Sequence, residues 1–264
     1  MTIAITRDIS PRFAECEITH IERTPIDIDL ARLQHRGYVN ALRKLGCDVI
    51  ELPAEAELPD SVFVEDTAFI LPELAVITRP GADSRKPETD SIIQALAPLI
   101  KMVCIQEPAT VDGGDVLVLG KKIYIGLSTR SNREAIDQLN ELLREYGYSV
   151  KGVALQDCLH LKSAVTRVDD KTLLINQNWV DPACFEDFEL IEVDPSEPQA
   201  ANCLPVGNSI IFPTAFPRTA AKLEERGYQL ITLDVSELAK AEGAVTCCSL
   251  IIDNKQSSAL SGGQ

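Results

Sequence analysis

The chain has 264 residues, of which 45% are apolar and 25% charged, a balance that supports a buried core and excludes a disordered acidic polymer. Forty acidic residues against 25 basic ones give a formal net charge of −15 at pH 7. This charge argues against nucleic acid as a partner, because a basic face supplies most of the attraction for a phosphate backbone.

The sequence also disfavours membrane insertion and secretion. No apolar run approaches the roughly 20 residues that span a bilayer, and the opening MTIAITRDIS lacks the basic and apolar regions of a secretory signal. We therefore expect a cytoplasmic protein that does not bind membranes. Eight cysteines without a CxxC pair are typical neither of a disulfide framework nor of a zinc ribbon.

Taken in chain order, the sequence repeats one plan. An apolar strand ends in Thr-Arg in TIAITRD (Thr2 to Asp8) and again in LAVITRP (Leu74 to Pro80), and KIYIGLSTR has the same shape. After the first and third of these strands, a helical pattern runs to a glycine stop, Gly46 or Gly147, and a further strand follows. Units of strand, loop, helix and strand, five in all, begin near Ile3, Ala75, Ile123, Leu173 and Ser209, and the fourth has little helix.

Each unit then ends in a further apolar segment, in order DSVFVEDTAFIL, VDGGDVLVLG, CLHLKSAVTRV, ANCLPVG and AVTCCSLII. Radial repetition would bury the sheet of each unit against its neighbours, so the sequence predicts an α/β fold: a five-bladed propeller of ββαβ-type repeats around a pseudo-fivefold axis. We expect residues 1–264 to form a single domain, folded to about residue 252, with 253–264 as a frayed tail. The alternative is that the repeats are coincidences of α/β patterning.

The apolar segments carry most of the groups that could perform chemistry, and a radial fold would bring them to one site. They are Asp60, Glu65, Asp66, Asp112, Asp115, His160, Cys247 and Cys248. A thiol, an imidazole and a carboxylate are the parts of a nucleophile, its proton-transfer partner and the group that orients the imidazole. Adjacent strand residues point to opposite faces, so at most one of Cys247 and Cys248 can be the nucleophile; a buried core thiol is the alternative for either.

Several of these residues have two readings from the sequence alone. His160, in an apolar strand segment, fits a satisfied core histidine as well as a catalytic base. Glu65 and Asp66 in a buried strand need a cation, which could be an internal arginine or a planar ligand such as a guanidinium. Arg79 and Arg130, which end repeat strands, could clamp a ligand carboxylate or be ordinary surface arginines.

Seven motifs are similar to those of the dimethylarginine dimethylaminohydrolases. In order they are PDSVFVED, ITRPGADSR, TVDGGDVL, GLSTRSN, LHLKS, AANC and VTCCS, and the likeness runs from about Arg32 to Ile252. That family belongs to the guanidine-modifying, or pentein, superfamily. The resemblance therefore implies a five-bladed α/β propeller, the fold that the repeats predict independently.

The resemblance also implies roles for individual residues. Cys247 would be the nucleophile, His160 the general acid and base, and Asp112 the carboxylate that orients His160. Substrate would be held by Asp66 and Glu65 at the guanidinium, by Asp60, Arg79 and Arg130 at the α-amino and α-carboxylate ends, and by Glu242 near the alkylated nitrogen. The stretch from Cys16 to Ile28 corresponds to a mobile lid, with no residue matched.

The activity that the resemblance implies is hydrolysis of asymmetric dimethylarginine and monomethylarginine to citrulline and dimethylamine or methylamine. The route is a covalent thiouronium on cysteine, with no metal and no cofactor. Arginine and agmatine deiminases carry an aspartate two residues after the catalytic histidine, where this chain has Lys162. Without that carboxylate the second guanidinium edge need not donate hydrogen bonds, so a methylated nitrogen could be tolerated.

Other functions stay open at this point. The chain could hydrolyse arginine or another guanidino compound, or it could be a non-catalytic binding protein on the same propeller. Zinc could bind through Cys247, Cys248 and His160, which we expect as inhibition at most. An unclosed propeller edge or an exposed apolar face could support a homodimer.

Overall fold

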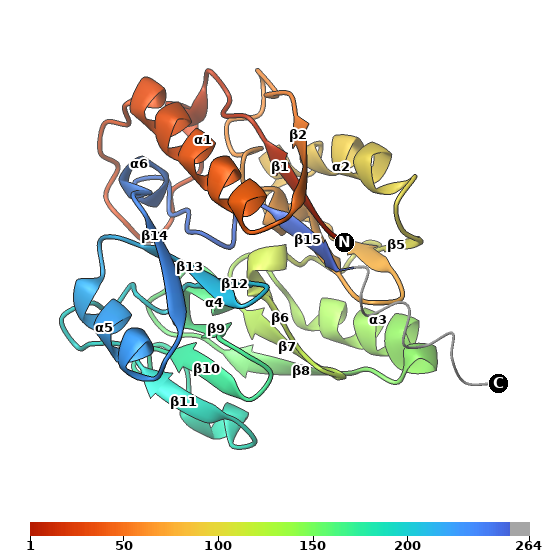
Figure 1. Ribbon diagram of the computed structural model, residues 1–264. Helices are drawn as coiled ribbons and strands as arrows, with labels where there is room; N and C mark the ends of the chain where they lie inside the picture. The colour runs from red at the N-terminus through yellow and green to blue at the C-terminus, as the bar shows by residue number, and fades with distance from the viewer. Residues whose placement is uncertain (254–264) are drawn as a thin grey trace.

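The computed structural model describes residues 1–253, which form five three-stranded sheets of one design (Figure 1). In each sheet the middle strand pairs antiparallel with one neighbour and parallel with the other. The sheets are β15 (Leu250–Asp253), β1 (Thr2–Arg7), β2 (Asp48–Leu52); β3 (Ala68–Ile70), β4 (Ala75–Ile77), β5 (Met102–Cys104); β6 (Val116–Leu119), β7 (Lys122–Leu127), β8 (Ser149–Ala154); β9 (Val165–Arg167), β10 (Thr172–Ile175), β11 (Glu189–Glu192); and β12 (Leu204–Val206), β13 (Ser209–Pro213), β14 (Gln229–Leu233).

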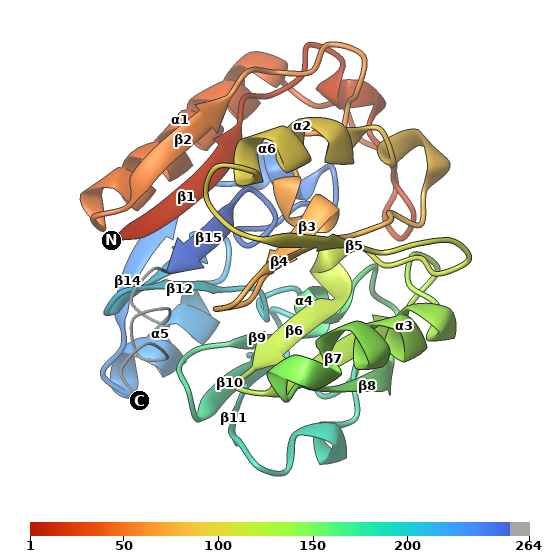
Figure 2. The same cartoon turned by 90° about the vertical axis from the view of Figure 1, so that its right-hand side faces the viewer.

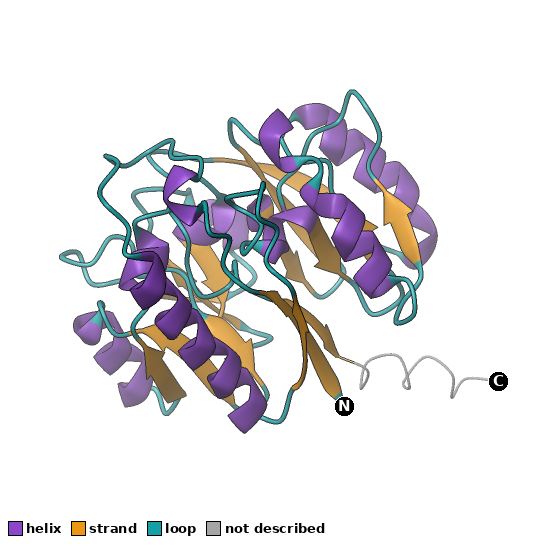
Figure 3. Ribbon diagram, turned by 90° about the horizontal axis from the view of Figure 1, so that it is seen from above, coloured by secondary structure: helices purple, strands orange, loops and turns teal. Residues whose placement is uncertain are grey.

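A helical crossover joins each middle strand to its parallel partner, as parallel pairing requires. The crossovers contain α1 (Ile28–Lys44), α2 (Glu88–Leu96), α3 (Arg133–Leu143) and α5 (Pro217–Glu225), while the fourth has only the short 3-10 helix η6 (Pro182–Phe185). These helices lie outside the strands in Figures 1 and 3. Local sequence sets their ends: the Asp27 side chain caps α1, the Asn132 side chain caps α3, and Gly147 adopts a positive φ after α3.

The middle strands begin where the repeats predict, but the apolar segment placed at the end of each unit belongs to the next sheet, which corrects the predicted repeat. The strand of each segment pairs antiparallel with the middle strand of the following unit. The last segment closes the circle, because β15 pairs with β1, and both views show the two strands side by side (Figures 1 and 2). Asp253 ends β15 as a strand residue; the rest of the predicted tail, 254–264, lies outside the described residues.

Five apolar clusters alternate with the five sheets around the ring. Each cluster joins residues of two consecutive sheets: Ile5 with Ile77, Val76 with Ile123, Tyr124 with Leu173, Leu174 with Ile210, and Ala4 with Ile211. The last pair links the fifth sheet to the first, so burial continues all the way round. The predicted five-bladed α/β propeller is thereby confirmed as the fold.

Five connectors lead from the last strand of one sheet to the first strand of the next. They are residues 53–67, 105–115, 155–164, 193–203 and 234–249, in order from connector 1 to connector 5. Short helical turns occur in connectors 1, 2, 3 and 5: η2 (Val64–Thr67), η4 (Gly113–Asp115), α4 (Leu161–Ala164) and α6 (Ser236–Ala239). Within residues 1–253, no helix has the length and apolar character needed to cross a membrane. All eight cysteines fall in this range and are unpaired.

One buried histidine on α1 makes stability depend on pH. His35 is 3% exposed beside Tyr38, and among the described residues its Nε2 has no hydrogen-bond partner. Burial outweighs the nearby Asp8 and Glu51 and lowers its pKa from 6.5 to about 4. Between pH 4 and pH 6.5 the His35 imidazole is protonated in the unfolded chain but neutral in the folded protein. The stability present above pH 6.5 is therefore lost as the pH falls toward 4.

We therefore expect His35→Leu to lose less stability than wild type as the pH falls below 6.5. Between pH 7 and pH 5, the free energy of unfolding should fall by roughly 2 kcal/mol more in the wild-type protein than in His35→Leu. Urea unfolding at the two pH values measures this difference, with His20→Gln at an exposed site as control. Equal losses in wild type and His35→Leu would contradict the burial argument.

Candidate active site

Connectors 1, 3 and 5 line one pocket that collects most of the residues singled out from the sequence. Asp60, Asp66, Arg130, His160, Glu242 and Cys247 all line it. Asp112 is fully buried behind His160, whereas Glu65 and Arg79 are absent from the lining. The pocket also includes an unpredicted residue, Arg85.

The functional side chains lie in turns rather than in strands, which corrects the sequence prediction. Glu65 and Asp66 belong to η2, His160 immediately precedes α4, and Cys247 lies in a turn before β15. The strand-alternation argument for the two cysteines is therefore wrong. They are distinguished by burial instead: Cys248 is fully buried, and Cys247 lines the pocket.

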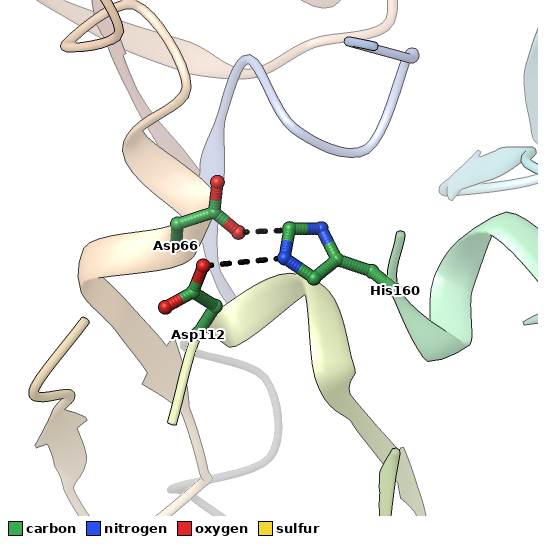
Figure 4. Close-up of side chains that lie close together, drawn as sticks. All are labelled: Asp66, Asp112 and His160. Carbon is green, nitrogen blue, oxygen red and sulfur yellow. Dashed lines mark hydrogen bonds and ion pairs between the residues drawn. The ribbon is translucent and has the colours of Figure 1, made fainter. Parts of the chain in front are cut away.

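His160 lies between two carboxylates (Figure 4). Its Nε2 is 3.2 Å from Asp112 Oδ2, and its Nδ1 is 4.0 Å from Asp66 Oδ1. Asp112 is held in turn by the backbone N–H of Gly81, which donates to its Oδ1 at 2.8 Å. The imidazole is thus fixed in orientation by Asp112.

The carboxylates control the charge of His160. Burial opposes an imidazolium, but Asp66, Asp115 and the hydrogen-bonded Asp112 outweigh it and raise the pKa of His160 to about 9. His160 is therefore protonated at neutral pH. A protonated imidazole in the pocket can serve as a general acid.

Two adjacent glycines, Gly113 and Gly114, allow this close packing because neither has a Cβ. Neither Gly113 nor Gly114 has a positive φ. A Cβ on Gly114 would lie 2.6 Å from His160 Nδ1 and 2.9 Å from Asp66 Oδ1, and one on Gly113 would lie 1.8 Å from the Glu65 carbonyl oxygen. The GGD motif therefore permits connectors 1, 2 and 3 to approach one another.

Asp115 holds the backbone at His160. Its Oδ1 accepts from the N–H of Leu161 at 2.9 Å, and its Oδ2 accepts from the hydroxyls of Ser128 and Ser131, each at 2.6 Å. Burial raises the pKa of Asp115 to about 6, against the influence of His160 and these hydroxyls. Asp115 is thus a second buried carboxylate that supports the imidazole.

Asp66 has an internal arginine partner, one of the two readings left open above. Arg85 Nη1 donates to Asp66 Oδ2 at 2.5 Å, and Arg85 also pairs with Glu88 at 2.8 Å. Burial works against ionisation of Asp66, but Arg85 and His160 prevail and lower its pKa to about 2. The Gly114 N–H donates to Oδ1 at 3.0 Å, so Asp66 is a fixed anion at the pocket wall.

Glu65 is engaged behind the pocket rather than in it. Lys162 Nζ donates to its Oε1 at 2.5 Å, and the hydroxyl of Thr246 donates to its Oε2 at 2.8 Å. The lysine that replaces the aspartate of the deiminases thus neutralises a carboxylate of connector 1. Both oxygens of Glu65 are occupied by side chains of the protein.

Of the two predicted arginines, only Arg130 reaches the pocket. Its Nη1 is 3.9 Å from Asp112 Oδ2, and its Nη2 donates to the hydroxyl of Thr19 at 3.2 Å. Arg79 lies elsewhere, 3.6 Å from Glu107 and bonded to the carbonyl of Ala109. The arginine that the ITRPGADSR motif supplies to the site is Arg85, at its end, rather than Arg79, near its start.

Residues 17–20 lie against the pocket, within the stretch expected to form a lid. Asp60 accepts from the Glu17 N–H at 3.2 Å, and Glu242 accepts from the N–H groups of Thr19 at 2.6 Å and His20 at 2.7 Å. Glu242 does this from the left-handed region, with φ of +57°, which is uncommon outside glycine. The Glu242 carboxylate therefore holds the segment expected to form a lid. The resemblance had implied a different role for it, beside the alkylated nitrogen of the substrate.

The side chain of Cys247 is a neutral thiol at neutral pH. Burial, followed by the negative charges of Glu65 and Asp66, holds the pKa of Cys247 well above its usual value. A cation placed between the thiol and these carboxylates would reverse that influence. The site is therefore suited to a thiol that ionises when a cationic ligand is bound.

Asp66, Asp112 and His160 offer ligand atoms within 4.8 Å of one another, a spacing that a metal ion could bridge. The two carboxylates already accept hydrogen bonds from Gly114 and Gly81, and Asp66 is paired with Arg85. Cys248, named in the zinc hypothesis, donates to the carbonyl of Ala244 at 3.8 Å away from the pocket lining. These contacts favour a role for the group in proton transfer.

The electrostatic account of His160 can be tested by titration, since the chain has only three histidines. In a Cys247→Ser background we expect the imidazole to titrate near pH 9, and Asp112→Asn to lower that pKa by at least about one unit through loss of a hydrogen-bonded anion. Nuclear magnetic resonance of labelled histidine measures both values. Asp170→Asn, at an exposed surface pair, is the control. A His160 pKa that Asp112→Asn leaves unchanged would refute the account.

The fold and the pocket together define a class: an α/β propeller hydrolase with a thiol, an imidazole and carboxylates around a site for a cation. Residues 20–252 match the family model described as "N,N dimethylarginine dimethylhydrolase, eukaryotic". The chain belongs to the dimethylarginine dimethylaminohydrolase family.

Curated relatives and solved structures agree with this assignment. The N(G),N(G)-dimethylarginine dimethylaminohydrolase of Streptomyces coelicolor is 39% identical over 249 residues, 94% of this chain and 95% of the relative. That of Pseudomonas aeruginosa is 39% identical over 219 residues, 82% of this chain and 86% of the relative. The structure of a cysteine-to-serine mutant of the Pseudomonas aeruginosa protein, complexed with citrulline, has a TM-score of 0.90 at 35% identity and covers 94% of this chain and 98% of its own.

A more distant neighbour shares the fold. The N-terminal domain of ArgZ, an arginine dihydrolase from cyanobacteria, matches with a TM-score of 0.81 at 18% identity, covering 96% of this chain and 97% of that one. At this identity the likeness concerns architecture alone. Together the comparisons confirm the family resemblance that the motifs indicated.

Proposed function

We propose that the protein hydrolyses asymmetric dimethylarginine and monomethylarginine to citrulline and dimethylamine or methylamine. The observation that carries this proposal is the pocket itself, where Cys247, His160 and Asp66 come together with Arg130. An anion and a cation at one site fit a substrate that is a guanidinium at one end and an amino acid at the other. The family membership supports the same activity.

In the proposed binding mode, Asp66 accepts hydrogen bonds from the substrate guanidinium. Asp60 and Arg130 hold the α-amino and α-carboxylate ends. Arg79 and Glu65 are left out of this ligand set, because neither lines the pocket. Arg85 instead holds Asp66 in place, and Glu242 holds the backbone of Thr19 and His20 beside the pocket.

The chemistry then follows from the charges. A guanidinium carbon is a poor electrophile, so the site must supply a thiolate held in line with it. The bound substrate cation favours loss of the Cys247 proton to solvent, since His160 is already protonated. The thiolate forms a bond to the guanidinium carbon, and the C–N bond to the methylated nitrogen breaks as His160 donates its proton to the departing amine.

A covalent thiouronium on Cys247 remains. Neutral His160 then takes a proton from water, whose oxygen attacks the same carbon. The C–S bond breaks as the proton of the added hydroxyl passes to the sulfur, which releases citrulline and the thiol. Asp112 keeps the imidazole oriented through both steps. The sequence of steps balances without a metal or a redox cofactor.

Lys162 supports methylated substrates over arginine. It pairs with Glu65 and is absent from the pocket lining, so it offers no carboxylate to the second guanidinium edge. That edge can then carry methyl groups in place of hydrogen-bond donors. Hydrolysis of arginine or another guanidino compound is the alternative activity. The predicted cytoplasmic location and homodimer stay predictions.

The test is release of citrulline and amine from purified protein given asymmetric dimethylarginine, monomethylarginine, arginine and agmatine in parallel. The proposal expects turnover of the two methylated substrates with arginine left intact. Turnover of arginine or agmatine instead would refute the substrate assignment while keeping the mechanism. Absence of turnover with all four would favour a non-catalytic propeller.

A further inference from the structure

The motif AANC matches the family, yet the proposed mechanism uses none of its residues. Its Asn202 lies in connector 4, two residues before β12, and is 4% exposed. Connectors 1, 3 and 5 carry Asp66, His160 and Cys247 at comparable positions before their strands. Asn202 is thus the buried polar side chain that the fourth repeat contributes to the centre of the ring.

The side-chain amide of Asn202 joins two other connectors. Its Nδ2 donates to the carbonyl oxygen of Lys162 at 3.0 Å and to the hydroxyl of Thr246 at 2.9 Å. Its Oδ1 accepts from the Thr246 N–H at 3.1 Å. Lys162 lies two residues after His160, and Thr246 immediately precedes Cys247. One amide therefore bonds to both segments that carry the reacting groups.

These contacts continue into a closed ring of buried polar groups. Thr246 donates to Glu65 Oε2 at 2.8 Å, and Lys162 Nζ donates to Glu65 Oε1 at 2.5 Å and to the carbonyl of Gly113 at 3.1 Å. The Glu65 N–H donates to the carbonyl of Cys247 at 3.1 Å. Every one of the five connectors takes part, so the ring determines how they lie relative to one another.

We propose that Asn202 is a positioning residue that holds the Cys247 turn against the helix that follows His160. The inference rests on the proposed function and extends it. Nucleophile and proton donor must be placed within fractions of an ångström for rapid reaction, and a small displacement costs far more in rate than in binding. Glu65, by the same argument, acts on the turn from behind the pocket.

The first test compares Asn202→Ala with Asn140→Ala. Asn140 makes the same pattern of bonds between α3 and β8: its Nδ2 donates to the carbonyls of Ile136 and Val150, and its Oδ1 accepts from the Val150 N–H. We expect Asn202→Ala to lower kcat for asymmetric dimethylarginine roughly 10- to 100-fold with KM changed less than about threefold. Asn140→Ala should leave kcat within about twofold, whatever its effect on stability.

A second pair of variants keeps the test decisive if Asn202→Ala does not fold. Thr246→Val removes the hydroxyl at nearly constant volume, and Thr246→Ser retains it. We expect kcat to fall at least about tenfold in Thr246→Val and to stay within about threefold of wild type in Thr246→Ser. Equal values in the two variants would overturn the proposal.

Hydrogen exchange supplies a readout that does not depend on the substrate. The peptide 244–249 should exchange at least about tenfold faster at one amide in Asn202→Ala than in wild type, because the Thr246 N–H loses its acceptor. If Asn202→Ala exchanges faster but the wild-type protein does not hydrolyse methylarginines, the proposed function is wrong and the structural role of Asn202 stands. Wild-type turnover that Asn202→Ala retains, or a loss confined to KM, would overturn the positioning role.

Discussion

Replacing Cys247 by serine should abolish hydrolysis of asymmetric dimethylarginine, with a loss on the order of 10⁴-fold or more in kcat. A hydroxyl ionises far less readily than a thiol, and the neighbouring Glu65 and Asp66 already oppose a negative charge at this position. The bound cation can offset this influence for a thiol but cannot generate an alkoxide. Steady-state citrulline release measures the loss.

Cys248 provides the matched control for that experiment. It is adjacent in sequence, fully buried and outside the pocket lining. Cys248→Ala should keep kcat within about threefold of wild type, since such a change acts on packing rather than on the reacting atoms. Turnover that is retained in Cys247→Ser but lost in Cys248→Ala would show that Cys248, rather than Cys247, is the nucleophile.

Replacing His160 by alanine should lower kcat for asymmetric dimethylarginine by about 10²- to 10⁴-fold, the usual contribution of a general acid and base. An amine leaves only when it is protonated, and in the proposed mechanism the donor is the His160 imidazolium, whose pKa the surrounding carboxylates raise to about 9. S-methyl-L-thiocitrulline provides a sharper comparison, because its thiolate leaves without a proton. His160→Ala should therefore still form the covalent adduct with this compound.

The two steps of the mechanism separate in that variant. We expect His160→Ala to release about one equivalent of methanethiol per protein and then stop, because water is no longer activated to cleave the thiouronium. A stopped assay for methanethiol and the mass of the Cys247 peptide follow the two events. Continuous turnover of the thiocitrulline by His160→Ala would show that another group activates the water.

The repeat pattern was enough to predict the architecture, while the pairing between repeats was not visible in it. Strands at Ile3, Ala75 and Ser209 could be recognised because they are apolar, β-branched and followed by a helical crossover. Which sheet the apolar segment after each unit would join depends on contacts between units. β15 completes the first sheet by pairing with β1, so the two ends of the described chain are in contact. Local sequence periodicity cannot predict such a long-range pairing.

Residue type alone left a core thiol and a core histidine open for Cys247 and His160, and the family motifs singled these two out; the structure places both in one pocket. Arg85 was missed for a different reason: it follows a loop whose path the sequence does not specify, so Arg79 near the strand end was chosen instead. Glu65 shows the same limit. Its adjacency to Asp66 predicted a shared ligand, yet the backbone turn of η2 directs it toward Lys162 and Thr246.

The measurement that tests the central claim most directly is the mass of the Cys247 peptide from wild-type protein quenched in acid during turnover of asymmetric dimethylarginine, in parallel with citrulline release by Cys247→Ser. The account predicts an adduct on Cys247 that carries no methyl group, with the same mass when monomethylarginine is the substrate, and no citrulline from Cys247→Ser. An unmodified Cys247 at every quench time, together with citrulline release that Cys247→Ser retains, would contradict it.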